Sequence, residues 1–303
     1  MILTVTPNPA LDLTYRVPRL QPGETHRAAA PAVRAGGKGL NVARVLAQTG
    51  TAAFILTTAG GPPGLRLADD LEASHLPSEL VPVEAPTRSS VAVVDESTGE
   101  TTVINETGST LSAAEWTALH DAVDRLVVPA TCVVGSGSLP PDAPDDVYAR
   151  VVAAAASRGL PSVIDAVGTP LVLAAEAGVS VVKPNRRELT ETTGHDDPVA
   201  GARVLLDAGA GLVVVSLGAE GMLAVPRDGA PVHARLGSPL TGNATGAGDA
   251  AVAAIASLLA VGVTDPSTLV RRATAWSAAA VLAPLAGELA PGFREFEERI
   301  ETG

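Results

Sequence analysis

A regular alternation of short apolar strands with helices, between residues 112 and 216, is the feature that most constrains the fold of this chain. The pattern predicts helices over 112–127, 144–158 and 169–177, and buried strands at Thr131–Gly135, Ser162–Asp165, Ser180–Val182 and Leu212–Ser216. Such alternation is typical of a mostly parallel sheet with helices on both faces. Aromatic residues make up only 2% of the chain, so its core must be aliphatic. We therefore expect an α/β fold.

Two β-rich runs interrupt this alternation and predict a lid. They are joined by a polar turn, as in a hairpin, and cover Ser89–Val94 and Thr101–Asn105. Earlier extended pieces are expected at Leu13–Val17 and Thr25–Val33. Because no linker or repeat divides the chain, we expect a single domain over 1–303, with lid strands from about 12–33 and 88–106.

Charge and composition disfavour several classes of function. The net charge is −12, and an acidic chain lacks the surplus of Lys and Arg with which proteins bind nucleic acid. No apolar run approaches the roughly 18 residues of a membrane helix, and the first residues lack the basic segment of a signal peptide. The single cysteine, Cys132, cannot form an internal disulfide. We expect a cytoplasmic protein that binds neither nucleic acid nor membrane.

The strongest chemical signal is the run of small residues Thr241–Asp249 (TGNATGAGD), which precedes an apolar helix. Glycines let a backbone approach an anion closely, and the first amides of a helix have no partner within the helix. Asp249 falls in the first helical turn, within reach of a group bound there. Phosphoryl transfer needs such a charge cradle and a base. Taken alone, the run is equally compatible with a simple turn and helix cap, because Asp is a favoured cap residue.

The second signal follows the strand Ser180–Val182 and consists of Lys183-Pro184-Asn185 and Arg186-Arg187-Glu188. The carboxyl end of a parallel strand is where ligands of open α/β folds bind. Asn185 and Glu188 share one face of a helical turn, and their oxygens suit Mg²⁺ held partly through water. Only two of the 21 basic residues are lysine, Lys38 and Lys183, and both lie in such loops. The alternative is an ordinary charged helix start on the surface.

The third signal combines Asp12 with the glycine loop and helix start Gly36–Asn41 (GGKGLN). Carboxylate, ammonium and amide groups at strand ends suit sugar hydroxyls, although turn chemistry accounts for the same residues. Other nucleotide motifs do not occur in the sequence. It contains no P-loop, and Gly135-Ser136-Gly137 is followed by Pro140 where a dinucleotide fingerprint has its last glycine.

Together and in this order, the three signals resemble the PfkB family of carbohydrate kinases, within the ribokinase-like superfamily. The resemblance runs from residue 1 to about 290 and includes GGKGLN at 36–41 and TGAGD at 245–249. The opening TPNPALD, the run Ser136–Pro140 and the pair Thr87-Arg88 are similar to 1-phosphofructokinases and tagatose-6-phosphate kinases. The resemblance implies a ribokinase-like parallel sheet flanked by helices, with a small β-sheet lid that is often a dimer interface. We therefore expect a homodimer formed through the lid.

The resemblance also implies a role for each matching residue. Roles at the transferring phosphoryl would fall to Asp249 as general base and to the amides of Gly246, Ala247 and Gly248 as anion hole. Residues that hold the sugar would be Asp12, Gly37 and Asn41, and those that bind the phosphate already on it would be Lys38 and Arg88. ATP would be bound by Lys183 at its phosphates and by Ser216, Gly218 and Gly221 along the nucleotide. Mg²⁺ would be held through water by Asn185 and Glu188.

The implied activity is the ATP-dependent phosphorylation of a phosphorylated ketohexose, with fructose 1-phosphate converted to fructose 1,6-bisphosphate. The loops 58–64 and 105–108 depart from the family pattern and are expected to border the sugar. Tagatose 6-phosphate and fructose 6-phosphate therefore stay open as acceptors. A hypothesis of another class is a catalytically silent sugar-phosphate sensor. The intact Asp249 argues against it, because a sensor needs no base.

Overall fold

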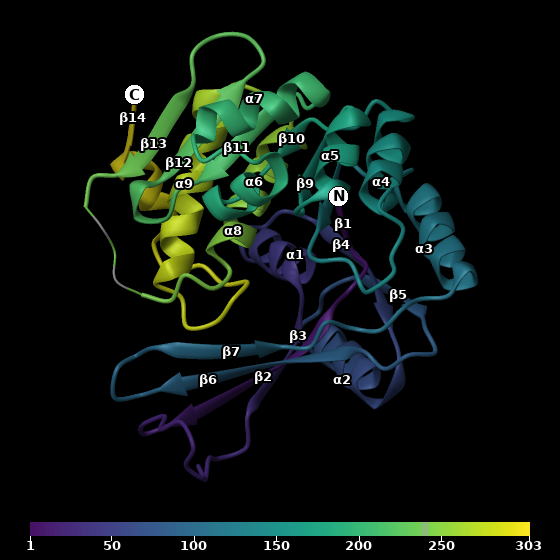
Figure 1. Ribbon diagram of the computed structural model, residues 1–303, viewed down its shortest axis with the longest axis vertical. Coiled ribbons are helices and arrows are strands. Elements are labelled where there is room, and N and C mark those ends of the chain that lie inside the picture. Colours follow the sequence, from purple (N-terminus) through teal and green to yellow (C-terminus); the bar gives the residue numbers. More distant parts are fainter. Residues whose placement is uncertain (239, 241) are drawn as a thin grey trace.

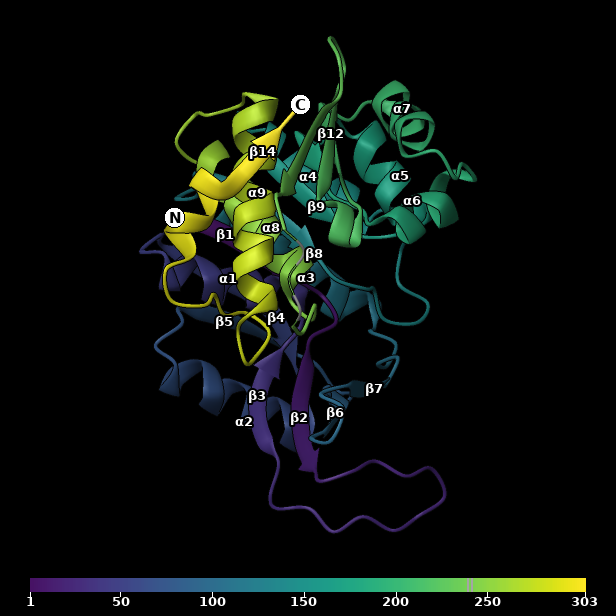
Figure 2. The same cartoon turned by 90° about the vertical axis from the view of Figure 1, so that its left-hand side faces the viewer.

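A large sheet, a small sheet and the helices packed on the large one make up the fold (Figures 1 and 2). The structure is a computed structural model that describes residues 1–238, 240 and 242–303. Thr241, the first residue of the small-residue run, thus lies outside the described residues. None of the helices in these ranges has the length and apolar character that a membrane span requires.

The large sheet has ten strands within the described residues, in the spatial order β14-β13-β12-β11-β10-β9-β8-β1-β4-β5. Its members are β1 (Ile2–Thr6), β4 (Ala53–Ala59), β5 (Ser78–Pro82), β8 (Cys132–Ser136), β9 (Ser162–Asp165), β10 (Val181–Val182), β11 (Leu212–Ser216), β12 (Met222–Pro226), β13 (Val232–Leu236) and β14 (Ile300–Thr302). The strands from β11 to β5 pair in parallel, and β12, β13 and β14 extend the sheet in antiparallel fashion. The parallel strands therefore bring their carboxyl ends to one edge.

Helices cover both faces of this sheet because its strands are apolar on both sides. Side chains alternate along a strand, so Val133 packs with the helices of one face, while Cys132 and Val134 pack with those of the other. One face carries α1 (Lys38–Gln48), α2 (Gly61–Ala73), α8 (Ala247–Leu259) and α9 (Pro266–Val281). The opposite face carries α3 (Ala113–Leu126), α4 (Val147–Ala156), α5 (Thr169–Glu176), α6 (Arg186–Thr193) and α7 (Pro198–Ala208).

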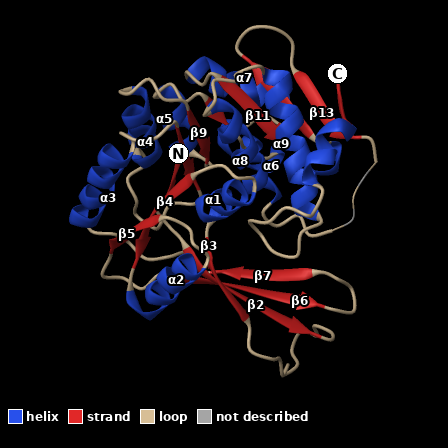
Figure 3. Ribbon diagram, turned by 180° about the vertical axis from the view of Figure 1, so that it is seen from behind, coloured by secondary structure: helices blue, strands red, loops and turns tan. Residues whose placement is uncertain are grey.

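The small sheet stands beside the large one and is seen below it in Figures 1 and 3. Its order is β3-β2-β6-β7, with the hairpin partners β6 and β7 antiparallel and β2 parallel to β6. The strands are β2 (Ala10–Val17), β3 (Ala32–Gly36), β6 (Arg88–Asp95) and β7 (Thr101–Asn105). Leu11 and Ala35 of this sheet pack on Leu67 and Leu71 of α2, which attaches it to the rest of the protein.

The α/β fold predicted from the strand and helix pattern is confirmed, with local differences. The helix α2 and the strand β5 occupy a stretch in which the sequence predicted only a loop at Gly60–Gly64. Two prolines follow Gly61 in the first turn of the helix, where the missing amide costs no hydrogen bond. The strand β3 begins at Ala32, later than the extended piece predicted at 25–33.

Candidate functional site

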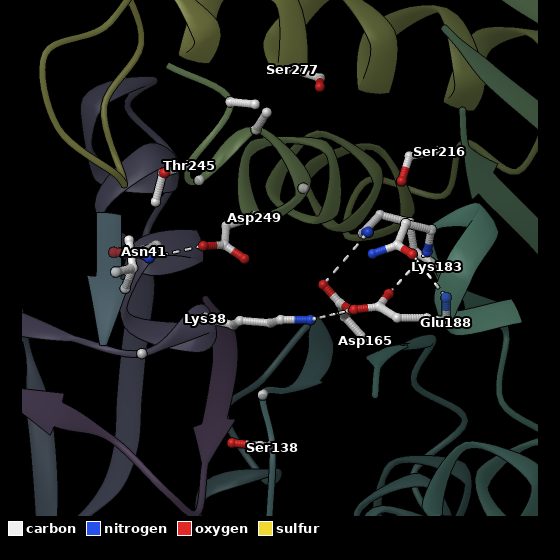
Figure 4. A pocket seen from close by; sticks show the side chains of 18 of the residues that line it. Lys38, Asn41, Ser138, Asp165, Lys183, Glu188, Ser216, Thr245, Asp249 and Ser277 are labelled. Carbon is white, nitrogen blue, oxygen red and sulfur yellow. Dashed lines mark hydrogen bonds and ion pairs between the residues drawn. The ribbon is translucent and has the colours of Figure 1, made fainter. Parts of the chain in front are cut away.

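A cavity of about 1230 Å³ lies between the small sheet and the carboxyl ends of the parallel strands. Every site residue predicted from the sequence lines it, although these residues come from both sheets and from the starts of three helices (Figure 4). They are Asp12, Gly37, Lys38, Asn41, Arg88, Lys183, Asn185, Glu188, Ser216, Gly218, Gly221, Gly246, Ala247, Gly248 and Asp249. The fold thus brings the three sequence signals to one place.

Asp165 lies at the floor of the cavity and was not among the predicted site residues. It ends β9, and the register of β10 on β9 pairs Val182 with Ile164, so Lys183 comes to stand beside it. The side chain of Asp165 is only 1% exposed. A strand that ends in a carboxylate at the carboxyl edge of a parallel sheet was a signal in the sequence that could have identified it.

Both lysines of the chain converge on the carboxylate of Asp165. Lys38 Nζ lies 3.0 Å from Asp165 Oδ1, and Lys183 Nζ lies 3.6 Å from Asp165 Oδ2. Burial alone would raise the pKa of Asp165, but the ammonium groups of Lys183 and Lys38 outweigh it and hold that pKa below its ordinary value. Burial likewise opposes the charge on Lys38, yet Asp165 and Glu188 raise the pKa of this lysine. The two lysines and the carboxylates of Asp165 and Glu188 thus form one cluster of opposite charges in the cavity.

Asp249 lies in the first turn of α8 and is 6% exposed. Asn41 Nδ2 donates a 2.8 Å hydrogen bond to Asp249 Oδ2. Burial raises the pKa of Asp249 to about 7, and the charge of Asp165 adds to this, whereas Lys38, Asn41 and Lys183 oppose it. Figure 4 shows Lys38 extending past Asp249 toward Asp165. A carboxylate with a pKa near neutral pH can take a proton from a hydroxyl, as a general base does.

The backbone at the start of α8 is shaped by glycine. Gly246 has φ 85° and caps the helix, and a Cβ there would lie 2.9 Å from Ala286 Cα. A Cβ on Gly248 would lie 3.4 Å from Lys183 Nζ, so the ammonium group sits against the first helical turn. The amide of Ala247, predicted as part of the anion hole, donates to Ala244 O at 3.1 Å. The predicted anion hole therefore requires that this amide exchange its turn partner for the anion.

The end of the cavity next to the small sheet contains Asp12 and Arg88. Burial raises the pKa of Asp12 to about 6, against the opposing charges of Arg88 and Arg34. Gly36 pairs with Ala10 in the β2–β3 ladder, and a Cβ on it would overlap the Asp12 carboxylate. Arg88 Nη1 donates to Glu106 O at 3.0 Å, and its Nε and Nη2 donate to the carbonyl of Asn8. This end therefore has a guanidinium that can bind an anion and a carboxylate that can accept hydrogen bonds.

The family model for pfkB family carbohydrate kinases matches residues 7–291 of the chain. The chain belongs to this family. It is 39% identical over 285 residues to the 1-phosphofructokinase of Xanthomonas campestris pv. campestris, covering 91% of this chain and 89% of the relative. It is 36% identical over 261 residues to the ATP-dependent 6-phosphofructokinase isozyme 2 of Mycobacterium tuberculosis, covering 84% and 76%. The predicted family and the predicted enzyme class, a carbohydrate kinase, are thereby confirmed.

Solved structures confirm the ribokinase-like fold of this pfkB family kinase. The phosphofructokinase-2 of Escherichia coli in complex with potassium is similar to the chain with a TM-score of 0.91, at 30% identity and with 98% of both chains covered. The ribokinase of Arabidopsis thaliana complexed with ribose and ATP gives a TM-score of 0.75 at 21% identity, covering 98% of this chain and 97% of the ribokinase. The second likeness concerns the fold alone.

The pair Asn185 and Glu188 of this kinase forms a reciprocal capping box at the start of α6. Asn185 Oδ1 accepts from Glu188 N at 2.8 Å, and Glu188 Oε2 accepts from Asn185 N at 2.9 Å. The other carboxylate oxygen, Oε1, lies 3.5 Å from Lys38 Nζ. Among the described residues no group of three or more His, Cys, Asp or Glu could hold a metal. One available carboxylate oxygen fits a magnesium ion that takes most of its ligands from water and phosphate.

The opposite end of the cavity has an apolar wall that the sequence signals did not indicate. It is formed where β12 and β13 face α9, by Met222, Leu236, Leu240, Ala278 and Val281. The predicted residues Ser216, Gly218 and Gly221 lie at its rim. Gly221 has φ 91°, and a Cβ there would overlap the carbonyl of Ala234. An apolar slot with a glycine-lined rim suits the flat base of a nucleotide.

The two loops expected to border the sugar have different positions in the kinase. Asn105, Glu106 and Thr107 line the cavity, as expected. The loop 58–64 does not appear among the described residues that line it, because Gly61 to Gly64 form the first turn of α2. Of the two loops, the segment 105–107 is thus the one beside the cavity, together with Ser138, which accepts a 3.4 Å hydrogen bond from Asn8 Nδ2.

Proposed function

We propose that the chain transfers a phosphoryl group from MgATP to a hydroxyl of a phosphorylated ketohexose, with fructose 1-phosphate converted to fructose 1,6-bisphosphate. The observation that carries the proposal is the position of Asp249. Its buried carboxylate, fixed by Asn41, faces two lysines in a cavity with an apolar slot at one end and Asp12 and Arg88 at the other. A base, a cationic centre and two separate binding ends are what a sugar kinase needs.

In this mechanism the acceptor hydroxyl lies against Asp249 and the terminal phosphate of ATP lies at the start of α8. The hydroxyl oxygen bonds to phosphorus as the bond from phosphorus to the bridging oxygen of ADP breaks, and the hydroxyl proton passes to Asp249. Lys183, which sits against Gly248, offsets the charge on the transferring oxygens. When bound, Mg²⁺ would neutralise phosphate charge, and the Oε1 oxygen of Glu188 would orient its waters.

Lys38 and Arg88 were predicted together as ligands of the sugar phosphate, but their partners separate them. Lys38 reaches Asp165 and Glu188 in the floor of the cavity, beside Lys183. We propose that Lys38 acts between the two substrates, near the transferring phosphoryl. Arg88 would bind the sugar phosphate by exchanging its backbone carbonyl partners for phosphate oxygens, to which a guanidinium can donate in bidentate fashion.

The role of Asn41 shifts in a similar way. The resemblance assigned it to the sugar, whereas its side-chain amide donates to Asp249. We propose that Asn41 occupies one oxygen of the carboxylate and leaves Asp249 Oδ1 for the acceptor hydroxyl. Asp12 and the backbone at Gly37 remain the proposed sugar ligands at the end next to the small sheet. The silent-sensor hypothesis is disfavoured, because burial of Asp249 is costly and serves no purpose in binding alone.

A homodimer through the small sheet is also proposed. Ile104, on the edge strand β7, is 63% exposed, and such an apolar edge is a surface that proteins usually cover. The phosphofructokinase-2 of Escherichia coli has been solved in a tetrameric inhibited form. Sedimentation equilibrium of the chain and of Ile104→Asp tests this part of the proposal, which predicts a dimer that the substitution weakens.

The experiment that tests the acceptor is ADP release with fructose 1-phosphate, fructose 6-phosphate, tagatose 6-phosphate and unphosphorylated fructose. We expect the highest kcat/KM for fructose 1-phosphate and very low activity with fructose. Arg88→Ala should raise KM for the phosphosugar far more than KM for ATP, and Arg66→Ala, an exposed change on α2, serves as control. One structure of the Escherichia coli protein contains fructose 6-phosphate. A preference of this chain for that compound would replace fructose 1-phosphate as the proposed acceptor. If the chain phosphorylates none of the four compounds, the proposal is overturned.

A further inference from the structure

The segment that follows α9 packs directly behind the residues that carry the chemistry. At Gly246, the cap of α8, a Cβ would lie 2.9 Å from Ala286 Cα and 3.1 Å from Gly287 N. At Gly287, which has φ 77°, a Cβ would lie 3.1 Å from both Asn41 Cα and Asn41 Oδ1. Residues 286 and 287 therefore touch the helix cap and the hydrogen-bond partner of Asp249. A displacement of this segment moves one or both of them.

Two anchors hold this segment in place. Gln48, at the end of α1, pairs with both backbone groups of Leu289 at 2.8 Å. The second anchor comes from the small sheet, where Arg34 Nη1 donates to Ala286 O at 3.2 Å and to Glu288 Oε1 at 3.0 Å. Figure 2 shows the segment, in yellow, beside α1 and above β3. Arg34 is thus the link between the small sheet and the start of α8.

The position of Arg34 also connects the segment to the sugar end of the cavity. In the β2–β3 ladder Arg34 is the partner of Asp12, and Arg88 begins β6, the strand next to β2 in the same sheet. The side chains of Arg34 and Glu288 are 21% and 33% exposed, and ion pairs with this much solvent around them add little to the free energy of unfolding. The pair therefore contributes little to the stability of the fold. Its position instead indicates a role in the alignment of the active site.

We propose that Arg34 and Glu288 are positioning residues that clamp residues 286–288 against Asn41 and Gly246, and so couple the small sheet to the alignment of Asp249. The inference rests on the proposed function, because it assigns Asp249 as the base. In the clamped state the Asn41 amide and the first turn of α8 hold fixed positions. When the clamp is removed, the segment shifts, and Asp249 and the start of α8 lose their alignment. ATP still binds at the apolar end of the cavity.

The test compares Glu288→Gln with a matched control, Glu297→Gln. Glu297 pairs with Arg272 at 3.0 Å with both side chains 31% exposed, and neither residue lines the cavity. We expect Glu288→Gln to lower kcat by about tenfold, as small misplacements of catalytic groups do, with little change in KM for ATP or in Tm. The double variant Arg34→Gln/Glu288→Gln should be no slower than Arg34→Gln alone, because both changes release the same clamp.

Hydrogen exchange followed by mass spectrometry gives a readout that does not depend on activity. Peptides covering residues 242–252 should exchange faster in Glu288→Gln than in the unsubstituted chain, and at the unsubstituted rate in Glu297→Gln. Unchanged exchange there, or equal kcat losses in the two glutamate variants, would overturn the clamp. If the unsubstituted chain phosphorylates no sugar but exchange responds as expected, the proposed function fails and the clamp stands.

Discussion

Replacement of Asp249 by Asn should stabilise the protein at neutral and alkaline pH. The carboxyl group is buried, and its pKa is raised from the ordinary 3.8 to about 7 in the folded protein. In the unfolded chain it ionises near its ordinary value, so folding at pH 8 has to bury a charge that water would solvate. An amide of the same shape carries no such charge, and its oxygen can still accept the hydrogen bond from Asn41.

The size of the effect follows from the two pKa values. A group whose folded pKa is raised contributes stability that is fully present below pH 3.8 and is lost as the pH rises through about 7. A shift of this size corresponds to about 4 kcal/mol, at about 1.4 kcal/mol for each pKa unit. At pH 8 the free energy of unfolding of Asp249→Asn should therefore be about 4 kcal/mol higher than that of the unsubstituted chain. The difference should vanish near pH 4.

Urea unfolding of both proteins, measured at intervals from pH 4 to pH 8.5, tests this directly. Asp69→Asn, an exposed change on α2, is the control and should show no comparable pH-dependent gain. The reasoning is refuted if the stability difference between Asp249→Asn and the unsubstituted chain is independent of pH. It is also refuted if Asp249→Asn is the less stable protein at pH 8.

The same structure makes three further predictions. The kcat/KM of the kinase should rise with pH and reach half its maximum near pH 7, because Asp249 acts only when ionised; a flat profile between pH 5.5 and pH 9 would contradict this. Gly36→Ala should raise KM for the phosphosugar at least about tenfold with little change in KM for ATP, since its Cβ overlaps the Asp12 carboxylate; equal changes in the two KM values would argue against it. Asp165→Asn should lower the free energy of unfolding by about 3–5 kcal/mol, because it leaves Lys38 and Lys183 without their shared carboxylate; a loss below about 1 kcal/mol in urea unfolding would be inconsistent with a buried ion cluster.

Most of the fold could be predicted because local patterns and tertiary structure agree. The apolar strands between Thr131 and Ser216 are short and regularly spaced, which favours the α/β fold class. Parallel pairing follows because a helix between two strands returns the chain to the start of the sheet. The helix α2 was missed because all five residues of Gly60–Gly64 are glycine or proline, which indicate a turn, whereas in the structure the two prolines lie in the first turn of a helix. The strand β14 has three residues and forms only because β13 offers an edge, which no local pattern indicates.

The residues of the site could be predicted from the sequence, but the contacts between their side chains could not. Motifs at 36–41, 183–188 and 245–249 each come with a local reason to face a ligand, and each contributes residues to the lining of the cavity. The pairing of Lys38 with Asp165 joins positions 127 residues apart, so nothing in the sequence near either residue could indicate it. The apolar wall around Met222 depends in the same way on how β12 meets α9. The expected cytoplasmic location and the absence of nucleic-acid and membrane partners stay predictions.

The most direct measurement is the turnover of Asp249→Asn with fructose 1-phosphate and saturating MgATP, made together with the dissociation constant of ATP. The account predicts that kcat falls by roughly 10²–10⁴-fold, as loss of a general base does, while ATP binds as tightly as before. A variant that turns over near the original rate would show that the hydroxyl proton leaves by another route, and would contradict the role of Asp249 as the base.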